Sequence, residues 1–156
     1  MSDRNSIITI SNNRKAYHEY FVLESLETGI VLFGTEVKSL RKYSVNLKDA
    51  WCSVVKSELF VNNMHIGIYE QGNIFNKEPL RVRKLLAHKK EILKLFDSTK
   101  QKGFSLIPLS LYFKNSNVKI QVGLCKGKKI YDKRRVLAER SAQRDIQRDL
   151  KENYRY

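Results

Sequence analysis

Basic side chains gather in the stretch KGKKIYDKRR, residues 126–135, where six of the ten residues are Lys or Arg. Ammonium and guanidinium groups at this density can neutralise phosphates, and a tyrosine ring can stack on a nucleobase. The alternative is a solvated basic run that serves solubility alone. Tyr131 and Asp132 interrupt the cations, and Asp132 can pair with Lys133 or Arg135, so the segment is not a plain lysine run.

Two further clusters combine cations with aromatic rings. In NRKAYHEY, residues 13–20, the cations Arg14 and Lys15 precede the rings of Tyr17, His18 and Tyr20. These rings either stack on bases or pack beneath a sheet with a solvated basic rim around them. In VKSLRKY, residues 37–43, the cations Lys38 and Arg41 are three residues apart. That spacing places both on one side of a helical turn, as phosphate contacts require.

Catalytic and metal-binding patterns are weak in this chain. His18, His65 and His88 are dispersed, and no cysteine cluster accompanies them at metal-ligand spacing. The glycines match neither of the nucleotide-binding fingerprints. The adjacent pair His18-Glu19 is the one candidate for general acid–base chemistry. We therefore expect a protein that is not an enzyme and that uses no metal and no cofactor.

The whole chain has 30 Lys and Arg against 16 Asp and Glu, a formal net charge of +14 over 156 residues. Such an excess repels itself in a compact domain, which predicts a polyanionic partner, nucleic acid ahead of an anionic membrane surface. The longest apolar runs, YFVL and IVLF, have four residues, whereas a bilayer span needs about 20. Cys52 and Cys125 lie in strand-like segments, which favours packed thiols over a disulfide. We expect a cytoplasmic protein with no membrane contact.

Alternating apolar residues predict mainly antiparallel β structure. The clearest signal covers residues 105–124, where Asn115-Ser116-Asn117 turns the chain between two alternating runs, Ile107, Leu109, Leu111 and Phe113, then Val118, Ile120, Val122 and Leu124. A second hairpin is expected over residues 19–37, with its turn at Thr28-Gly29. Residues 50–55 and 59–69 predict strands joined by residues 56–58.

The same chain predicts few helices. Residues 35–43 fit a short helix that Thr35 can cap, and residues 70–80 fit a loop closed by Pro79. Residues 81–103 place Leu85, Leu86, Ile92, Leu93 and Phe96 on one helical face, although the first few residues fit an extended strand equally well. Short strands with one or two helices predict a small closed or nearly closed antiparallel β-barrel with helices packed outside.

We expect three parts: a mobile N-terminal arm over residues 1–14, an RNA-binding barrel domain over residues 15–125, and a basic C-terminal tail over residues 126–156. The tail holds 11 Lys/Arg and 5 Asp/Glu. As a helix it would carry the cationic row Arg140, Arg144, Arg148, Lys151 and Arg155 opposite a thin apolar row, Ala138, Ala142, Ile146 and Leu150. Because so little apolar surface cannot hold a helix alone, we expect a tail that is disordered when free and helical against RNA. The alternative is a frayed, solvated helix.

Several ordered strings resemble the SsrA-binding protein family, also called small protein B or SmpB. They are NRKAYHEYFVLE, GTEVKSLR, YEQGNIFN, RKLLAHKKEI, LYFKN and VKIQVGLCKGKKIYDKR, and they run from about Asn12 to Arg135. The resemblance implies an oligonucleotide-binding-like (OB-like) β-barrel with flanking helices and a basic tail. It also implies transfer-messenger RNA as the partner of a monomeric protein, and rescue of stalled bacterial ribosomes by trans-translation as the role.

The resemblance also implies site residues. In the family the barrel grips the tRNA-like domain, and the RNA-binding positions here are Asn13, Lys15, Glu27, Lys38, Arg41, Leu86, His88 and Lys119. Glu27 is expected to accept hydrogen bonds from a base edge or to orient a neighbouring arginine, because a carboxylate cannot hold a phosphate.

The family's tail enters the small ribosomal subunit beside the decoding centre and the empty messenger channel. The corresponding ribosome-binding residues are Lys126, Gly127, Lys128, Lys129, Tyr131, Asp132, Lys133, Arg134, Arg140, Arg144 and Arg148. Tyr131 stands where some relatives carry histidine, and either ring can stack on a nucleotide. Two rival functions remain: a general RNA chaperone or ribosomal protein without preference for a tRNA-like fold, and an RNA-acting enzyme that uses His18 and Glu19.

Overall fold

Two long strands, β8 (Phe104–Lys114) and β9 (Asn117–Gly127), form the central antiparallel hairpin of the computed structural model, which describes residues 6–101 and 103–153. Asn115 and Ser116 form the two-residue turn with φ of 50° and 69°. Positive φ values at both turn residues are typical of two-residue hairpin turns, because the twist of such a turn matches the right-handed twist of the two strands. The hairpin predicted from alternation is therefore confirmed.

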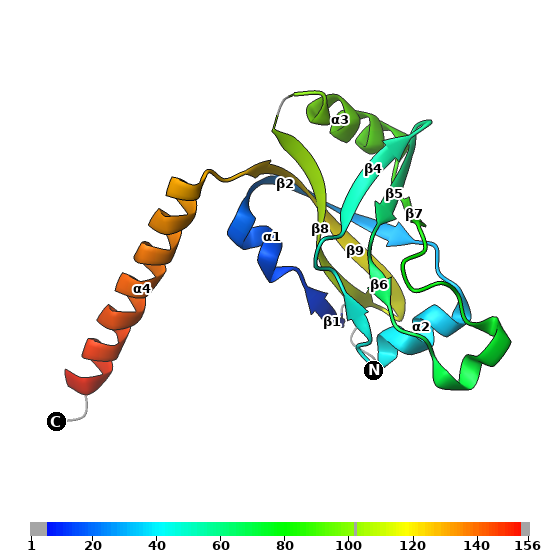
Figure 1. Cartoon of the computed structure of the whole chain (residues 1–156), viewed down its shortest axis with the longest axis horizontal. Helices are drawn as coiled ribbons and strands as arrows, with labels where there is room; N and C mark the ends of the chain where they lie inside the picture. The colour runs from blue at the N-terminus through cyan, green and yellow to red at the C-terminus, as the bar shows by residue number, and fades with distance from the viewer. Residues whose placement is uncertain (1–5, 102, 154–156) are drawn as a thin grey trace.

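The strands pair in a closed cycle. The main sheet has the order β1-β8-β4-β5-β7-β2-β9, and β9 pairs again with β8, so six strands form a ring (Figure 1). Besides the hairpin, the ring contains β2 (Tyr20–Ile30), β4 (Trp51–Val55), β5 (Glu58–Asn62) and β7 (Arg83–Leu86). All of its pairings are antiparallel. The expectation of a mainly antiparallel sheet with flanking helices is thus confirmed, and closure takes the form of this ring of pairings.

The second predicted hairpin is wrong. Strand β2 runs without interruption through Thr28 and Gly29, pairs with β9 from Tyr20 to Gly29, and pairs with β7 at its end. Thr28 is buried and its Oγ1 donates a hydrogen bond to the Ile120 carbonyl oxygen at 3.1 Å. Gly29 serves close packing, because a Cβ there would lie 3.3 Å from the Cβ of Leu86.

The N-terminal segment also differs from the expected arm. Residues Ile7–Asn12 form β1, which pairs with β8 and buries Ile10, and α1 (Arg14–Glu19) follows directly. The edge of β8 offers backbone partners to these residues, which a sequence pattern without a clear period does not reveal. Residues 1–5 of the expected arm lie outside the described residues.

Two helices lie close to their predicted positions. The first is α2 (Gly34–Arg41), with Phe33 at its N-cap where Thr35 was expected; the side chain of Glu36 accepts a hydrogen bond from the Phe33 backbone N–H. The second is α3 (Lys89–Thr99), which starts later than the pattern indicated. Leu85 and Leu86 belong to β7, so the extended alternative is the correct one there.

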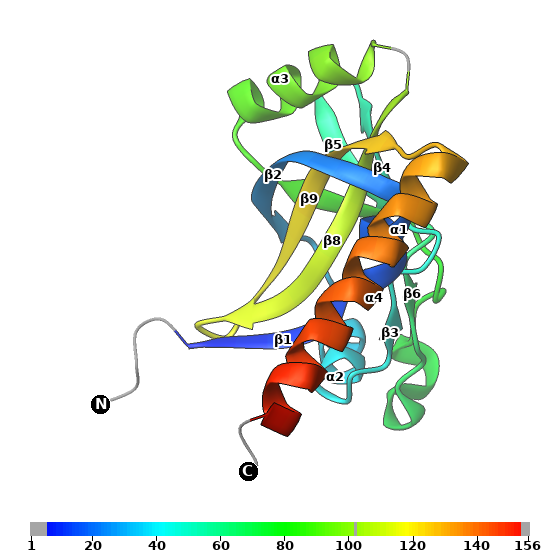
Figure 2. The same cartoon turned by 90° about the vertical axis from the view of Figure 1, so that its left-hand side faces the viewer.

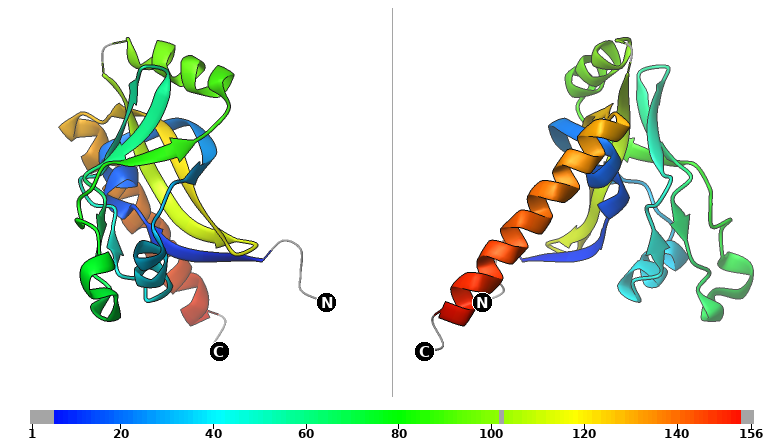
Figure 3. Two further views of the ribbon diagram at one scale, coloured as in Figure 1. Left: turned by 90° about the vertical axis from the view of Figure 1, so that its right-hand side faces the viewer. Right: turned by 60° about the vertical axis from the view of Figure 1, so that its left-hand side comes forward.

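The remaining elements are short. The predicted strand over residues 59–69 is divided into β5 and β6 (His65–Ile66) at Asn63, whose φ is 60°. Strand β6 pairs with β3 (Val45–Asn46) in a separate two-stranded sheet. The predicted loop over residues 70–80 contains a 3₁₀ segment, η1 (Glu70–Phe75), which lies beside α2 at the end of the domain away from α3 (Figures 1 and 3).

The core fills the ring, and a smaller cluster lies outside it. Leu59, Val61, Leu85, Leu111, Ile120 and Val122 are among the fully buried side chains of the ring interior. A register shift between Pro108 and Ser110 turns Ile107 and Leu109 away from that core, toward Ala16 of α1. Cys52 and Cys125 are buried free thiols, as predicted.

The last helix, α4 (Ile130–Asn153), projects from the ring as a separate arm (Figures 1 and 2). Its apolar residues Leu137, Ile146 and Leu150 are 47%, 60% and 51% exposed. The pairing of β9 with β2 continues to Gly127, the second residue of the predicted tail. Among the helices that the structure describes, none is long and apolar enough to cross a membrane.

Candidate nucleic-acid interface

Four adjacent strands carry one aligned row of residues on the outside of the ring. Gly29 of β2 is the partner of Leu86 in β7 and of Lys119 in β9, and Lys119 is in turn the partner of Tyr112 in β8. Successive residues of a strand point to opposite faces. Because Leu85 and Ile120 are buried in the ring core, Leu86 and Lys119 lie on the outer face. We call this surface the outer sheet face.

Glu27 lies on the same face, two residues before Gly29. Its carboxylate accepts hydrogen bonds from the Tyr112 hydroxyl and, at 3.2 Å, from the Lys114 ammonium. The Tyr112 hydrogen bond, with help from Lys114 and the charge of Lys119, holds the pKa of Glu27 below its usual value. The side chain remains 39% exposed. Glu27 is therefore an ionised, oriented hydrogen-bond acceptor in a cationic surround, and its partners are a tyrosine and a lysine in place of the expected arginine.

A polar row continues the outer sheet face beside Glu27. Gln121 Nε2 donates to Ser25 Oγ at 2.9 Å, and Ser110 Oγ donates to Gln121 Oε1 at 3.4 Å. These side chains span β2, β9 and β8 and offer amide and hydroxyl groups to a ligand. The face thus combines a fixed carboxylate, neutral polar groups and flanking lysines.

Asn13 and Lys15 lie elsewhere. Asn13 is 5% exposed; its Oδ1 accepts from the Ala16 N–H at 3.1 Å and its Nδ2 donates to the Pro108 carbonyl at 2.9 Å. The Asn13 amide is therefore engaged in capping α1 inside the protein, and its contact with RNA stays a prediction. Lys15 pairs with Asp49 at 2.6 Å, and the hydrogen bond to Asp49 raises the pKa of Lys15. Both residues border a groove of about 560 Å³ between α1, β4, α3 and β8.

The other predicted RNA-binding residues divide between two places. His88 is exposed at the N-cap of α3, two residues after Leu86, and its backbone N–H donates to Glu91 at 3.4 Å. Lys38 and Arg41 are exposed on α2, with the Lys38 ammonium 5.4 Å from the centre of the Tyr69 ring. The structure thus brings Glu27, Leu86 and Lys119 together and leaves the α1 and α2 residues on separate surfaces.

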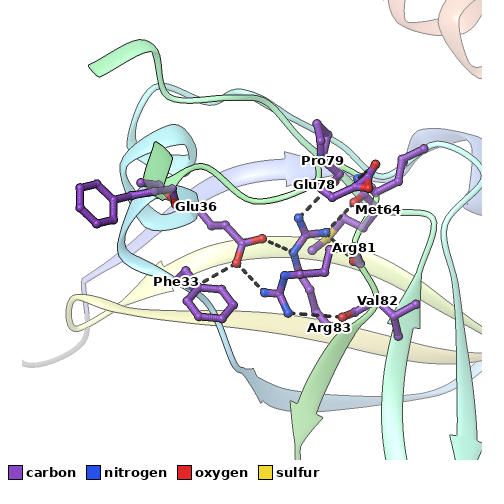
Figure 4. A network of polar contacts seen from close by, with 11 residues as sticks. Phe33, Glu36, Met64, Glu78, Pro79, Arg81, Val82 and Arg83 are labelled. Atoms are coloured by element: carbon purple, nitrogen blue, oxygen red, sulfur yellow. Dashed lines mark hydrogen bonds and ion pairs between the residues drawn. The ribbon is translucent and has the colours of Figure 1, made fainter. Parts of the chain in front are cut away.

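A buried ion-pair network fixes α2 against the segment before β7 (Figure 4). Glu36 binds Arg83 Nε at 2.6 Å and Arg81 Nη2 at 2.5 Å, and Arg83 Nη1 donates to the Met64 carbonyl at 2.7 Å. Burial opposes ionisation of Glu36, but hydrogen bonds from Phe33 N–H and from both arginines outweigh it and lower the pKa of Glu36. Sequence reasoning missed this network, whose only signal is the Arg-x-Arg spacing after the loop.

The first tail residues belong to the folded domain. Lys126 and Gly127 pair with Phe21 and Tyr20 of β2. The backbone N–H of Lys128 donates to the Glu19 carbonyl at 2.8 Å, and its ammonium donates to the Tyr17 carbonyl at 3.1 Å. The start of the tail is thereby attached to α1.

The later tail residues lie on α4 or just before it. Lys129 precedes the helix, which begins with the segment that holds Tyr131, Asp132, Lys133 and Arg134. Arg140, Arg144 and Arg148 are exposed along it, and Arg148 lies 3.9 Å from Asp145. Arg155 of the predicted row lies outside the described residues. Within residues 6–101 and 103–153, no group of three or more His, Cys, Asp or Glu side chains is arranged to hold a metal ion.

Comparison with known proteins identifies the family to which the chain is similar. The sequence model described as SmpB protein matches residues 10–152. The chain is 57% identical over 148 residues to the SsrA-binding protein of Clostridium novyi (strain NT), covering 95% of this chain and 94% of that one. It is 54% identical over 156 residues to the SsrA-binding protein of Clostridium perfringens (strain 13 / Type A), covering 100% of both.

A solved structure is similar as well. Its chain has a TM-score of 0.66 and 43% identity, covers 77% of this chain and 85% of its own length, and is described as "tmRNA-SmpB: a journey to the center of the bacterial ribosome". By profile, identity and structure together, the chain belongs to the SmpB family of SsrA-binding proteins.

Proposed function

We propose that this protein binds the tRNA-like domain of SsrA, the transfer-messenger RNA, and delivers it to stalled ribosomes for trans-translation. Its relatives are named SsrA-binding proteins, and the similar solved structure is described as tmRNA-SmpB in the bacterial ribosome. The observation that carries the proposal on the protein side is the outer sheet face, where an ionised Glu27 is held between Tyr112 and Lys114. The protein acts as a monomer in the bacterial cytoplasm.

On the outer sheet face, different residues provide the affinity for RNA and the specificity for one RNA. Lys114 and Lys119 supply the sequence-independent attraction to phosphates. The negative charge of Glu27 weakens that attraction. In a chain of net charge +14, Glu27 is therefore better explained by a role in specificity than by a role in affinity. An oriented carboxylate accepts hydrogen bonds from a base amino group or a ribose 2′-hydroxyl, which splayed-out loop nucleotides expose. Recognition of a folded RNA loop therefore fits this face better than non-specific binding does.

The ring of strands serves as an OB-like barrel in this proposal. OB-folds bind oligonucleotides on an exposed strand face, with neighbouring loops extending the contact. Here the outer sheet face supplies the strands, and Leu86 adds an exposed apolar side chain, 52% accessible, for stacking or van der Waals contact with a base. The RNA-binding domain and the tail then divide the work between SsrA RNA and the ribosome.

The tail acts on the ribosome after RNA delivery, in the path beside the decoding centre and the messenger channel. Lys126, Lys128 and Lys129 neutralise ribosomal RNA phosphates, and Tyr131 stacks on a nucleotide. The exposed apolar side chains of Leu137, Ile146 and Leu150 on α4 support a helix that is ordered only against a partner. We therefore retain the proposal that the tail is disordered when free and helical on the ribosome.

The test of the RNA contact is the charge reversal Glu27→Lys. If Glu27 reads or orients a base, the variant should lose discrimination between SsrA RNA and bulk tRNA while it retains non-specific binding; Glu27→Gln, which keeps an acceptor oxygen, should lose less. The matched control is Glu24→Lys, the same charge change on β2 at a residue that is 52% exposed and lies 3.8 Å from Lys94 of α3. A Glu27→Lys variant that discriminates as well as the Glu24→Lys control would contradict the proposal.

A further inference from the structure

Segment η1 presents two large apolar side chains to solvent. Ile74 is 88% exposed and Phe75 is 70% exposed, and we call this pair the η1 tip. These are the two most exposed large apolar side chains among the described residues, and contiguous exposed apolar surface is typical of interaction sites. The tip lies at the end of the domain formed by η1 and α2, opposite α3 (Figures 1 and 3).

The backbone that carries the η1 tip is held in place by side chains. Asn76 Oδ1 accepts from the Tyr69 N–H at 3.0 Å, and Asn76 Nδ2 donates to the Tyr69 carbonyl at 2.7 Å and to the Asn73 carbonyl at 3.3 Å. Thr35 Oγ1 of α2 donates to the Phe75 carbonyl at 3.1 Å. Gly72 packs so closely that a Cβ there would lie 2.9 Å from Asn76 and from Thr35. The tip is thus pre-ordered, which lowers the entropy cost of binding.

Four cations, at α2 and in the segment that follows η1, lie over aromatic rings. The ammonium groups of Lys38 and Lys42 are 5.4 and 5.0 Å from the centre of the Tyr69 ring. The Lys77 ammonium and the Arg81 guanidinium are 4.3 and 4.7 Å from the centre of the Phe33 ring. We call these four cations the basic collar. Cations interleaved with aromatic rings are the chemistry that holds single-stranded nucleotides, through phosphates and base stacking.

The outer sheet face continues toward this end of the domain. Along β2 and the extended residues after it, Glu27, Gly29, Val31 and Phe33 alternate outward, and Val31 and Phe33 are 43% and 45% exposed. Val82, just before β7, is 53% exposed. Six residues of extended chain span roughly 20 Å. One folded RNA can therefore contact Glu27 and the collar at the same time.

We propose that the η1 tip and the basic collar form a second contact for the RNA bound at the outer sheet face, with Phe75 stacking on an unpaired base and the collar lysines holding adjacent phosphates. The inference rests on the proposed function, because it assigns the same RNA to both surfaces. Charge complementarity and continuity with the outer sheet face favour SsrA RNA as the occupant over an apolar pocket of a protein.

The experiment measures the affinity of the full chain for SsrA RNA at fixed salt. Phe75→Ala should weaken binding roughly 5- to 150-fold, the range of one base–aromatic stack. Phe75→Trp should bind like the parent chain, and Phe75→Leu, which keeps apolar area but loses the ring, should bind like Phe75→Ala. Leu93→Ala is the matched control, since Leu93 is a 40% exposed apolar residue on α3.

The salt dependence of the affinity tests the basic collar separately from the η1 tip. Lys77→Gln should reduce the slope of log affinity against log salt by about 0.7–0.9, the value of one phosphate contact, whereas Phe75→Ala should leave the slope unchanged. Parental affinity of Phe75→Ala or of Phe75→Leu would overturn the stacking contact. Parental RNA affinity of Phe75→Ala combined with lost ribosome binding would assign the tip to a ribosomal partner and overturn it as well.

Failure of this inference is distinguishable from failure of the proposed function. If the parent chain prefers SsrA RNA over bulk tRNA but Phe75→Ala binds as the parent does, only the second contact is wrong. If the parent chain itself shows no preference, the proposed function fails, and with it the assignment of the tip to that RNA.

Discussion

Replacing Glu36 by glutamine should destabilise the end of the domain that carries η1. The Glu36 carboxylate accepts from Phe33 N at 3.0 Å, Arg81 Nη2 at 2.5 Å and Arg83 Nε at 2.6 Å, while Arg83 is 0% exposed. Glutamine keeps one oxygen but turns an NH₂ donor toward a guanidinium donor, which leaves the buried charge of Arg83 without its counter-charge. Removing one partner of a buried ion pair costs about 3–5 kcal/mol. For a domain of this size the loss corresponds to a drop in Tm of roughly 10–20 °C.

Thermal unfolding followed by circular dichroism at pH 7 measures this effect. The matched control is Glu58→Gln. Its carboxylate lies 3.1 Å from the ammonium of Lys84, the residue after Arg83 in β7, and the Lys84 and Glu58 side chains are 43% and 49% exposed. An exposed pair contributes at most about 1 kcal/mol, so this control should change Tm little. If Glu36→Gln lowers Tm no more than Glu58→Gln does, the buried ion-pair network does not stabilise the packing of α2.

The same pair of proteins predicts a pH dependence. The pKa of Glu36 is lowered in the folded state, where hydrogen bonds from Phe33, Arg81 and Arg83 outweigh the opposing effect of burial, relative to an ordinary value of 4.5. A lowered folded pKa contributes stability that is complete above the unfolded value and is lost as pH falls through the folded value. The Tm difference between the parent chain and Glu36→Gln should therefore shrink below about pH 4.5. A constant difference down to pH 3 would contradict this assignment.

Three further outcomes follow from the structure. A chain that ends at Lys129 keeps the β9 pairing and should bind SsrA RNA with most of its affinity and a shallower salt slope; loss of RNA binding would refute the division between domain and tail. Ile146→Pro, which blocks a helix by roughly 3 kcal/mol or more, should leave SsrA binding intact but abolish peptide tagging on stalled ribosomes, and normal tagging would exclude a helical tail. Gly123→Ala would place a Cβ 2.7 Å from Leu109 Cδ1, so urea unfolding should show a loss of about 1–3 kcal/mol; an unchanged midpoint would show that Leu109 relaxes freely.

The β8–β9 hairpin could be predicted because its signal is local: apolar alternation and a turn lie within one short segment. Strand β2 could not, since Thr28-Gly29 has the composition of a turn and only the long-range pairing with β9 keeps the chain extended there. Strand β1 depends in the same way on β8, a partner about 100 residues away. Contacts distant in sequence override local propensity in these segments.

The site shows the same division. Glu27, Leu86 and Lys119 came from the family resemblance, and their common surface follows only from the strand register. Asn13 came from the same resemblance, but its amide is buried at the start of α1. Arg83 was missed because a buried arginine is rare, and its partner Glu36 lies 47 residues earlier in the chain.

The central claim is that the outer sheet face recognises a tRNA-like fold within SsrA RNA. Competition binding of labelled SsrA RNA against unlabelled bulk tRNA, with the parent chain at one stated salt concentration, tests it most directly. Bulk tRNA should displace SsrA RNA only at a large excess, and the preference should persist as salt rises and the phosphate contribution falls. Equal competition by bulk tRNA at every salt concentration would contradict it and would favour a general RNA-binding protein.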